Sequence, residues 1–240
     1  AGMLSELRKQ KVSRIVLVPS FLTTLLEAFP ELGRLLPDLH YWFVGGEPVP
    51  IPLVEAFKNA LPGRKLINIY GATEVCGDAT WYDFDEMPPG LANAPIGHPL
   101  LGVWTRIVDE NFVELTAMEA GEVCVSGICL ARGYLGRPDL TAERFIANPF
   151  PEGGRLYRTN DLGRRLPDGA IEYLGRLDQQ VKIRGMRVEL GEVESRLSEF
   201  PDLAQVLALA QEAEAGRRTL VAFLSLPRAA RYRRLHSGPT

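Results

Sequence analysis

The sequence predicts an α/β protein with three parts in order along the chain: a parallel-sheet α/β region, an antiparallel barrel-like region and a small α+β unit. Short apolar runs alternate with helical patterns through about residue 80, which is typical of a parallel sheet with crossover helices. Beyond that point proline and glycine are frequent and the apolar runs are shorter, which is typical of antiparallel strands joined by tight turns. We place the first region at residues 1–80, the second at 81–177 and the third at 178–240.

The parallel region begins with the end of an amphipathic helix in residues 3–10. The expected strands are apolar runs that stop at proline or glycine: residues 14–18, 40–44 and 65–70. The helical patterns between them are residues 20–29 and 50–60. Ser20 is the expected N-cap of the first helix, because its hydroxyl can accept a backbone N–H of the first turn. Pro52 suits the first turn of the second helix.

The antiparallel region contains prolines and glycines that are expected to mark loops and tight turns: Pro88, Pro89, Gly90, Pro95, Gly97, Pro99 and Gly102. The expected strands are residues 104–108, 122–125 and 171–174. A short helix capped by Thr141 is expected at residues 141–145. In the last unit we expect a hairpin, a helix and two strands, at residues 184–186, 190–199, 206–210 and 220–224.

The composition is that of an ordinary globular protein and argues against a membrane-spanning or nucleic-acid-binding function. Apolar residues make up 46% and charged residues 24%, the net charge is −3, and no apolar run is long enough to span a bilayer. Six arginines and no acidic residue lie in residues 217–240, but we interpret this tail as a ragged chain end and expect neither a nucleic-acid nor a membrane partner. The N-terminus has no signal-peptide pattern and no initiator Met, so we expect a piece of a longer protein.

Neither the cysteines nor the tryptophans predict a functional site. The cysteines are Cys76, Cys124 and Cys129. They lack metal-binding spacing, and we expect them to be reduced and mostly buried, which suits a cytoplasmic protein. The tryptophans, which we expect in the core, are Trp42, Trp81 and Trp104.

Residues 68–74, with the sequence NIYGATE, follow a strand of the parallel region, at the end where open α/β folds place their ligands. Gly71 allows a sharp turn and a close approach of the backbone to a ligand. Tyr70 offers a flat ring to a nucleobase, Thr73 offers a hydroxyl to a phosphate, and Glu74 offers a hard oxygen to Mg²⁺. These residue types suit nucleotide chemistry, although a simple strand-to-loop turn would have the same pattern.

Three further motifs follow in order. Residues 121–145 contain GEVCVSG, LARGYL and RPDLTAERF, residues 157–162 are YRTNDL, and residues 175–194 are GRLDQQVKIRGMRVELGEVE. Together with NIYGATE, this series resembles the core motifs of the amino-acid adenylation domains of nonribosomal peptide synthetases, within the adenylate-forming, AMP-binding superfamily. The resemblance covers about residues 12–225.

This resemblance implies an ATP-dependent ligase that works in two steps. An amino-acid carboxylate and ATP give an aminoacyl-AMP and pyrophosphate, with Mg²⁺ screening the phosphates. The aminoacyl group then passes to the phosphopantetheine thiol of a carrier protein. The implied partners are therefore the amino acid or another carboxylic acid, the carrier protein and the neighbouring modules of a longer synthetase.

The resemblance also implies which residues contact the nucleotide: Gly45, Gly46, Glu47, Asn68, Tyr70, Gly71, Thr73, Asp161 and Arg176. Residues 45–47 would lie against the adenine opposite Tyr70, and Asp161 would accept both ribose hydroxyls. Asn160 stands where the family has glycine, and asparagine tolerates a positive φ better than other non-glycine residues.

The catalytic residues that the resemblance implies are Thr73, Glu74, Arg176 and Lys182, with Glu74 also the Mg²⁺ ligand. Asp178 would be the hinge of a C-terminal lid, which this sequence contains in truncated form. Lys182, Arg184 and Gly185 would form the hairpin that faces the site in the second step.

The implied substrate pocket consists of Val16, Phe43, Gly45, Ile69 and Gly77, with Asp78 near its rim. This set is mainly apolar, so it favours a small or hydrophobic amino acid. The aspartate that holds the substrate's amino group in the family is not in this sequence, so a hydroxy or aryl acid stays an alternative.

Two other functions stay open. An acyl-CoA synthetase of the same superfamily would share Y-G-x-T-E and the carboxylate of Asp161, although RPDLTAERF and KIRGMRVELGEVE fit the peptide-synthetase branch better. A truncated interaction fragment would have the fold without the activity.

The isolated 240-residue chain is expected to be inactive or nearly so. Its sequence contains neither the Gly/Ser/Thr-rich phosphate loop ending in Lys-Gly nor the late N-G-K motif of the family. We expect no ATP–pyrophosphate exchange above background with any proteinogenic amino acid, and robust exchange with even one of them would contradict this expectation.

Overall fold

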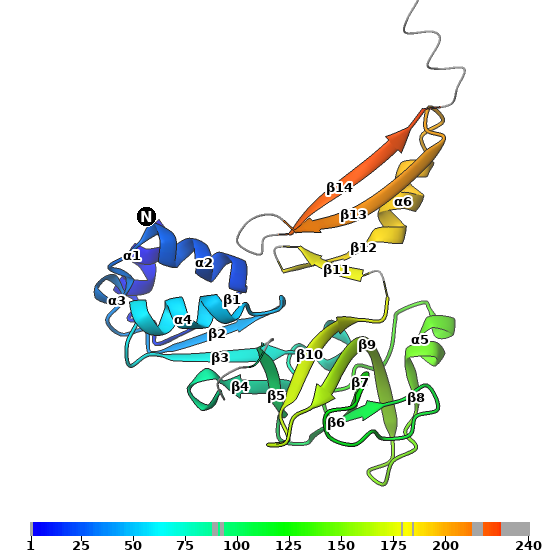
Figure 1. Cartoon of the computed structure of the whole chain (residues 1–240), viewed down its shortest axis with the longest axis horizontal. Helices are drawn as coiled ribbons and strands as arrows, with labels where there is room; N and C mark the ends of the chain where they lie inside the picture. Colours follow the sequence, from blue (N-terminus) through cyan, green and yellow to red (C-terminus); the bar gives the residue numbers. More distant parts are fainter. Residues whose placement is uncertain are drawn as a thin grey trace, which may run out of the picture. The chain divides into compact units, whose positions relative to one another are not determined.

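The computed structural model describes residues 2–87, 91, 94–178, 180–183, 185–212 and 218–226. The chain divides into two compact units, Ala1–Leu177 and Asp178–Thr240, termed unit 1 and unit 2 (Figure 1). Within the described residues, no helix combines the length and the apolar character needed to cross a membrane.

The first half of unit 1 is a parallel α/β region. Its elements in chain order are α1 (Gly2–Lys9), β1 (Arg14–Leu17), α2 (Pro19–Ala28), α3 (Leu32–Leu35), β2 (Tyr41–Gly45), α4 (Ile51–Ala60) and β3 (Lys65–Tyr70). β1, β2 and β3 are parallel neighbours in that order, and the helices lie beside them (Figure 1). Leu22 of α2, Trp42 of β2 and Phe57 of α4 are almost fully buried, and the rings of Trp42 and Phe57 meet edge to face at 5.8 Å. The α/β class predicted from alternating strands and helices is confirmed.

The start of α2 differs from the prediction that Ser20 caps it. Val18 is the N-cap and Pro19 occupies the first helical position. Proline suits that position because it lacks an N–H that would find no partner inside the helix. The backbone N–H of Ser20 instead donates to the Glu47 carboxylate at 3.0 Å. A carboxylate from the loop after β2 therefore satisfies the N-terminus of α2.

The second half of unit 1 is antiparallel and continues the same sheet. Its elements are η1 (Thr73–Val75), β4 (Thr80–Asp83), η2 (Phe84–Glu86), β5 (Pro95–Pro99), β6 (Val103–Val108), β7 (Ala120–Gly127), α5 (Pro138–Arg144), β8 (Phe145–Ala147), β9 (Arg155–Arg165) and β10 (Ile171–Arg176). The order in the ten-stranded sheet is β1-β2-β3-β4-β5-β10-β9-β7-β6, and β8 pairs with β9. Short antiparallel strands are present here, as the density of proline and glycine predicted.

The expectation that Pro95, Gly97 and Pro99 mark turns is wrong, because all three lie in β5. The prolines are the first and last residues of the strand, where a missing N–H costs least. Gly97 has φ 84°, and a Cβ there would lie 1.9 Å from the Trp81 carbonyl oxygen. Residues 88–90 of the same prediction lie outside the described residues.

α5 begins earlier than predicted. Arg137 is its N-cap and Pro138 its first helical residue, so the expected cap Thr141 lies inside the helix. As in α2, a proline marks the first turn, because its fixed φ suits that position.

Two of the tryptophans and one of the cysteines are exposed, against expectation. Trp81 is 39% and Trp104 44% exposed, whereas Trp42 is 1% exposed. Trp81 and Trp104 lie on the accessible sides of β4 and β6, where they alternate with buried neighbours. Cys76 is exposed and Cys124 is buried.

Unit 2 consists of β11 (Gln180–Ile183), β12 (Met186–Glu189), α6 (Leu190–Ser198), β13 (Gln205–Glu212) and β14 (Arg218–Ser225). β11 and β12 form one antiparallel hairpin, and β13 and β14 form another. The Glu194 carboxylate of α6 accepts the Ala208 backbone N–H of β13 at 2.8 Å, which ties the helix to this second hairpin. The predicted hairpin, helix and two strands are all present.

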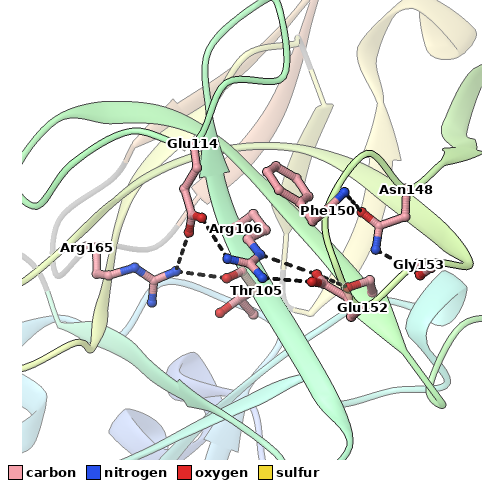
Figure 2. Close-up of polar contacts among 9 residues, drawn as sticks. Thr105, Arg106, Glu114, Asn148, Phe150, Glu152, Gly153 and Arg165 are labelled. Carbon is pink, nitrogen blue, oxygen red and sulfur yellow. Dashed lines mark hydrogen bonds and ion pairs between the residues drawn. The ribbon is translucent and has the colours of Figure 1, made fainter.

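A charged cluster holds the loop after β8 to the antiparallel sheet (Figure 2). The Arg106 guanidinium of β6 donates to the two Glu152 carboxylate oxygens at 3.3 and 2.8 Å, and to Glu114 at 2.7 Å. It also lies 4.8 Å from the centroid of the Phe150 ring. Burial opposes ionisation of Glu152, but the hydrogen bonds from Arg106 outweigh it and hold the pKa of this carboxyl below its ordinary value.

Glu152→Gln is expected to destabilise the chain by about 2 kcal/mol at neutral pH, because Arg106 would lose a charged acceptor. Since the folded-state pKa of Glu152 lies below its unfolded value, this contribution is complete above the unfolded pKa and is lost as the pH falls through the folded one. Urea unfolding should therefore separate wild type and variant at neutral pH and bring them together as the pH is lowered toward about 3.

Glu110→Gln, at an exposed glutamate, is the control for this experiment. A difference between wild type and Glu152→Gln that stays the same at both pH values would contradict the prediction.

Candidate functional site

β2 and β3 end side by side, and the loops of two predicted site segments follow them. Gly45 pairs with Ile69, so Gly46 and Tyr70 are the next residues on the two chains. A Cβ at Gly45 would lie 2.6 Å from the Ile69 carbonyl oxygen, so a side chain does not fit there. Gly46 has φ 81°, in the left-handed region that turns the chain away from the strand. Residues 45–47 are thereby brought next to the end of β3.

Tyr70 and Asp161, which were predicted from separate motifs, are in direct contact. The Tyr70 hydroxyl donates to Asp161 Oδ2 at 2.5 Å, which joins β3 to β9 across 91 positions of sequence. Both residues are buried. Burial, and then the charge and hydrogen bonding of Asp161, raise the pKa of Tyr70 well above its ordinary value. Tyr70 is therefore a protonated donor throughout the physiological pH range.

A bulge in β9 sets the position of Asp161. The pairing of β7 with β9 skips from Asp161 to Arg158 between two consecutive residues of β7, so β9 carries extra residues at this point. One of them, Asn160, has φ 58°, in the left-handed region that favours glycine. The other, Thr159, accepts the backbone N–H of Asp161 on its Oγ1 at 2.9 Å. The turn therefore forms with asparagine in the position where the family has glycine.

The same bulge is bonded to the end of unit 1. The carbonyl oxygen of Asn160 accepts the backbone N–H of Leu177 at 2.8 Å. The backbone N–H of Asn160 donates to Glu122 Oε1 at 3.1 Å. Leu177, the residue before the predicted hinge Asp178, is thus fixed to the segment that carries Asp161.

Arg176 holds the second oxygen of Asp161. The two residues pair directly between β10 and β9, and Arg176 Nη1 donates to Asp161 Oδ1 at 2.7 Å. Arg176 Nη2 donates to the Thr159 carbonyl oxygen at 3.2 Å. The guanidinium and the carboxylate are 11% and 8% exposed, so their charges offset each other in a mostly dry site. Because a carboxylate oxygen can accept more than one hydrogen bond, Asp161 can also accept hydroxyl groups of a ligand.

Thr73 and Glu74 lie in η1, just after Gly71. A Cβ at Gly71 would lie 1.9 Å from the Gly77 carbonyl oxygen, so this turn closes only with glycine. Thr73 is exposed and could reach a ligand. Glu74 is buried, and its Oε1 accepts the Tyr134 hydroxyl at 2.7 Å. Tyr134, part of the LARGYL motif, thus contacts a predicted site residue, although the sequence analysis assigned it no role.

The described part of the chain contains no group of three or more His, Cys, Asp or Glu side chains that could hold a metal ion. In nucleotide sites Mg²⁺ is bound by one or two carboxylates together with substrate phosphates and waters, and it needs no protein cage. The single carboxylate of Glu74 fits this kind of binding.

Four of the five predicted pocket residues share one face of the sheet. Val16 of β1 pairs with Phe43 of β2, and Gly45, two positions farther along β2, pairs with Ile69 of β3. Because side chains alternate along strands, this face is opposite the one that packs on the helices. Gly77 lies outside the strands, in the loop after η1, with φ 109°.

Trp81, which was expected in the core, belongs to this same face. It pairs with Ile69 in the antiparallel ladder of β3 and β4, so the two side chains point to the same side. The sequence TWYD has no polar–apolar alternation, so the exposure of Trp81 is seen only in the structure. Asp78, the predicted rim residue, is exposed in the loop before β4.

Glu47 and Asn68 use their side chains to hold the site together. The Glu47 carboxylate accepts the Ser20 backbone N–H of α2 at 3.0 Å. Asn68 is buried, and its Nδ2 donates to the Pro95 carbonyl oxygen at the start of β5 at 2.8 Å. The first contact fixes the loop after β2 to α2, and the second fixes β3, two residues before Tyr70, to β5.

The remaining predicted residues lie in unit 2. Asp178 Oδ1 accepts the backbone N–H of Gln180 at 3.1 Å. Lys182 pairs with Arg187 across the β11–β12 hairpin, and Gly185 has φ 75° at its turn. Arg184 lies outside the described residues.

The sequence is similar to known proteins along most of its length. A family model described as AMP-binding enzyme matches residues 1–135. Bacitracin synthase 3 from Bacillus licheniformis is 40% identical over 222 residues, which cover 92% of this chain and 3% of that protein. The chain therefore spans only a small fraction of this relative.

Two solved structures show the same fold. Holo-PA1221, an NRPS protein containing adenylation and PCP domains and bound to a vinylsulfonamide inhibitor, matches with a TM-score of 0.87 at 27% identity, over 98% of this chain and 40% of that chain. The Vibrio cholerae adenylation domain AlmE, in complex with glycyl-adenosine-5′-phosphate, matches with a TM-score of 0.79 at 28% identity, over 92% of this chain and 42% of that chain. The chain spans less than half of each solved chain.

Asn160→Ala is expected to lower the free energy of unfolding by about 1 kcal/mol, because alanine tolerates the left-handed backbone less well than asparagine. Asn160→Gly should be neutral or slightly stabilising, since glycine adopts this conformation without strain. Chemical denaturation of the three proteins measures both effects. A loss of the same size in the alanine and glycine variants would show that the amide side chain matters and not the backbone conformation, against this prediction.

Proposed function

Because this chain belongs to the AMP-binding enzyme family, as part of the adenylation domain of a nonribosomal peptide synthetase, we propose that it binds the adenosine of ATP in a ligase that joins an amino acid to AMP. The observation that carries this proposal is the buried cluster of Tyr70, Asp161 and Arg176. An enzyme that forms an adenylate must hold the nucleoside firmly while the phosphate reacts. A carboxylate fixed from two sides, by residues at the ends of β3 and β10, suits that requirement.

We assign the adenosine to a site at the loops that follow β2 and β3. Asp161 would accept the two ribose hydroxyls, because a carboxylate oxygen can accept more than one hydrogen bond. The backbone of residues 45–47 and the ring of Tyr70 would flank the adenine. The hydrogen bonds of Glu47 and Asn68 support this arrangement, because they fix the loop after β2 to α2 and the end of β3 to β5.

In the first step, a carboxylate oxygen of the amino acid forms a bond to the α-phosphorus of ATP, and the bond from that phosphorus to the pyrophosphate oxygen breaks. The products are the aminoacyl-AMP and pyrophosphate. Negative charge grows on the phosphate oxygens during this exchange. We propose that Arg176 lowers its cost, because the guanidinium lies beside the carboxylate that holds the ribose.

Thr73 and Glu74 are the candidates for the phosphate side of the site. The exposed Thr73 hydroxyl would donate to a phosphate oxygen, and Glu74 would be the protein ligand of a nucleotide-bound Mg²⁺. When bound, Mg²⁺ neutralises charge on the phosphates. AlmE, one of the similar structures, contains a glycyl adenylate, which supports this reaction type.

The apolar sheet face is the candidate pocket for the side chain of the amino acid. Val16, Phe43 and Ile69 line it with Trp81, and Gly45 lies on the same face without a side chain. This lining favours a small or hydrophobic amino acid over a charged one.

We assign the second step to unit 2, with a carrier protein as partner. The aminoacyl group would pass to a phosphopantetheine thiol, and AMP would leave. Asp178 is the proposed hinge, and Lys182 and Gly185 are the proposed residues of the β11–β12 hairpin in this step. The PCP domain of PA1221 supports a carrier partner.

Asp161→Ala is expected to weaken AMP binding by about tenfold or more, because two hydrogen bonds to a charged acceptor are lost. NMR titration of the chain with AMP measures the affinity. Asp161→Asn keeps the size of the side chain and should weaken binding as well, which separates loss of the charge from loss of the fold.

Asp38→Ala is the matched control, since this aspartate lies before β2, at the end of the strand away from the site. AMP affinity that is unchanged in both Asp161 variants would refute the proposed role, and so would equal weakening by Asp38→Ala.

A further inference from the structure

The loop between β7 and α5 contacts Glu74 at two points. The Ala131 backbone N–H donates to the Glu74 carbonyl oxygen at 2.9 Å. The Tyr134 hydroxyl, 60 positions away in sequence, donates to Glu74 Oε1 at 2.7 Å. One contact fixes the main chain of Glu74, and the other fixes its carboxylate.

The main chain at Tyr134 is held against α5. Thr141 Oγ1 accepts the Tyr134 backbone N–H at 2.9 Å and donates to the Arg137 carbonyl oxygen at 2.8 Å. Gly133 has φ 145°, and a Cβ there would lie 2.4 Å from Thr141 Cγ2. Only glycine lets the loop approach Thr141 this closely, so the backbone of Tyr134 has little freedom.

The ring of Tyr134 and the rest of the loop are held as well. The Tyr134 ring meets Phe145 edge to face at 5.7 Å. The Arg155 guanidinium lies 5.3 Å from the Phe145 ring centroid and donates to the carbonyl oxygens of Ala131 and Arg132 at 2.7 and 2.8 Å. The hydroxyl is therefore presented to Glu74 from a ring and a main chain that are both fixed by neighbours.

The geometry points to Tyr134 as a positioning residue for Glu74, an inference that rests on the proposed role of Glu74 as ligand of a nucleotide-bound divalent cation. A glutamate side chain loses rotamer freedom when it binds an ion, and a side chain that is already ordered loses less. The hydrogen bond from Tyr134 also orients the carboxylate, as the partner residues of metal ligands do. The LARGYL and RPDLTAERF segments then have a defined role, because they hold Tyr134 in place.

Tyr134→Phe tests this inference, because it removes the hydroxyl and keeps the ring that packs on Phe145. In the full chain we expect the affinity for Mn²⁺–ATP to fall about tenfold. The affinity for AMP, measured with a chelator, should change less than about twofold, since the proposed adenosine contacts do not include Glu74. NMR reports AMP by shift changes and Mn²⁺–ATP by broadening of the amide signals of residues 73–77.

Two further variants complete the design. Thr141→Val removes the acceptor of the Tyr134 N–H and should weaken Mn²⁺–ATP binding in the same direction. Tyr41→Phe, at an exposed tyrosine of β2, should change neither affinity. Mn²⁺–ATP affinity that is unchanged in Tyr134→Phe would overturn the inference, and so would equal weakening of AMP and Mn²⁺–ATP, which indicates a purely structural role. A wild type that binds AMP no better than Asp161→Ala would instead overturn the proposed function on which the inference rests.

Discussion

One buried carboxylate, that of Asp161, joins the two halves of unit 1. Removing such a charge from water costs several kcal/mol unless partners offset the loss. The Tyr70 hydroxyl from β3 and the Arg176 guanidinium from β10 are those partners. The parallel and antiparallel regions must therefore meet with the ends of β3 and β10 against the bulge of β9 before the charge is accommodated. The contact that completes the fold thus also forms the candidate ligand site.

The sequence predicts the elements of this fold wherever the pattern is local. β3 has the predicted bounds because an apolar run ends at Gly71, and the α6 and β11–β12 segments follow local patterns in the same way. The strand β5 is not predicted because it depends on distant chain, and the starts of α2 and α5 are missed although each is marked locally by a proline at the first helical position. Ser20 donates to Glu47 from another loop, and β5 exists only through its pairing with β4 and β10.

For the candidate site, residue types and motif order are informative, but contacts are not. The sequence places Tyr70, Asp161 and Arg176 in three motifs, and only the structure shows that one carboxylate receives both of the other side chains. Tyr134 escapes prediction because its hydroxyl donates to Glu74, 60 positions away in sequence. It also lies in a loop, where the sequence has no periodic pattern. The position of Trp81 is not predicted for a different reason. Its strand has only four residues, and the glycines and prolines on either side indicate loops.

The bond between Leu177 N–H and the Asn160 carbonyl oxygen has a mechanical consequence. The backbone N–H of Asn160 in turn donates to the Glu122 carboxylate, so the chain is held by hydrogen bonds at the point where it leaves unit 1. Torsion applied from the C-terminal side is resisted at that bond, which lies directly before the proposed hinge Asp178. The bulge that positions the Asp161 carboxylate thereby also fixes the point at which the chain leaves unit 1.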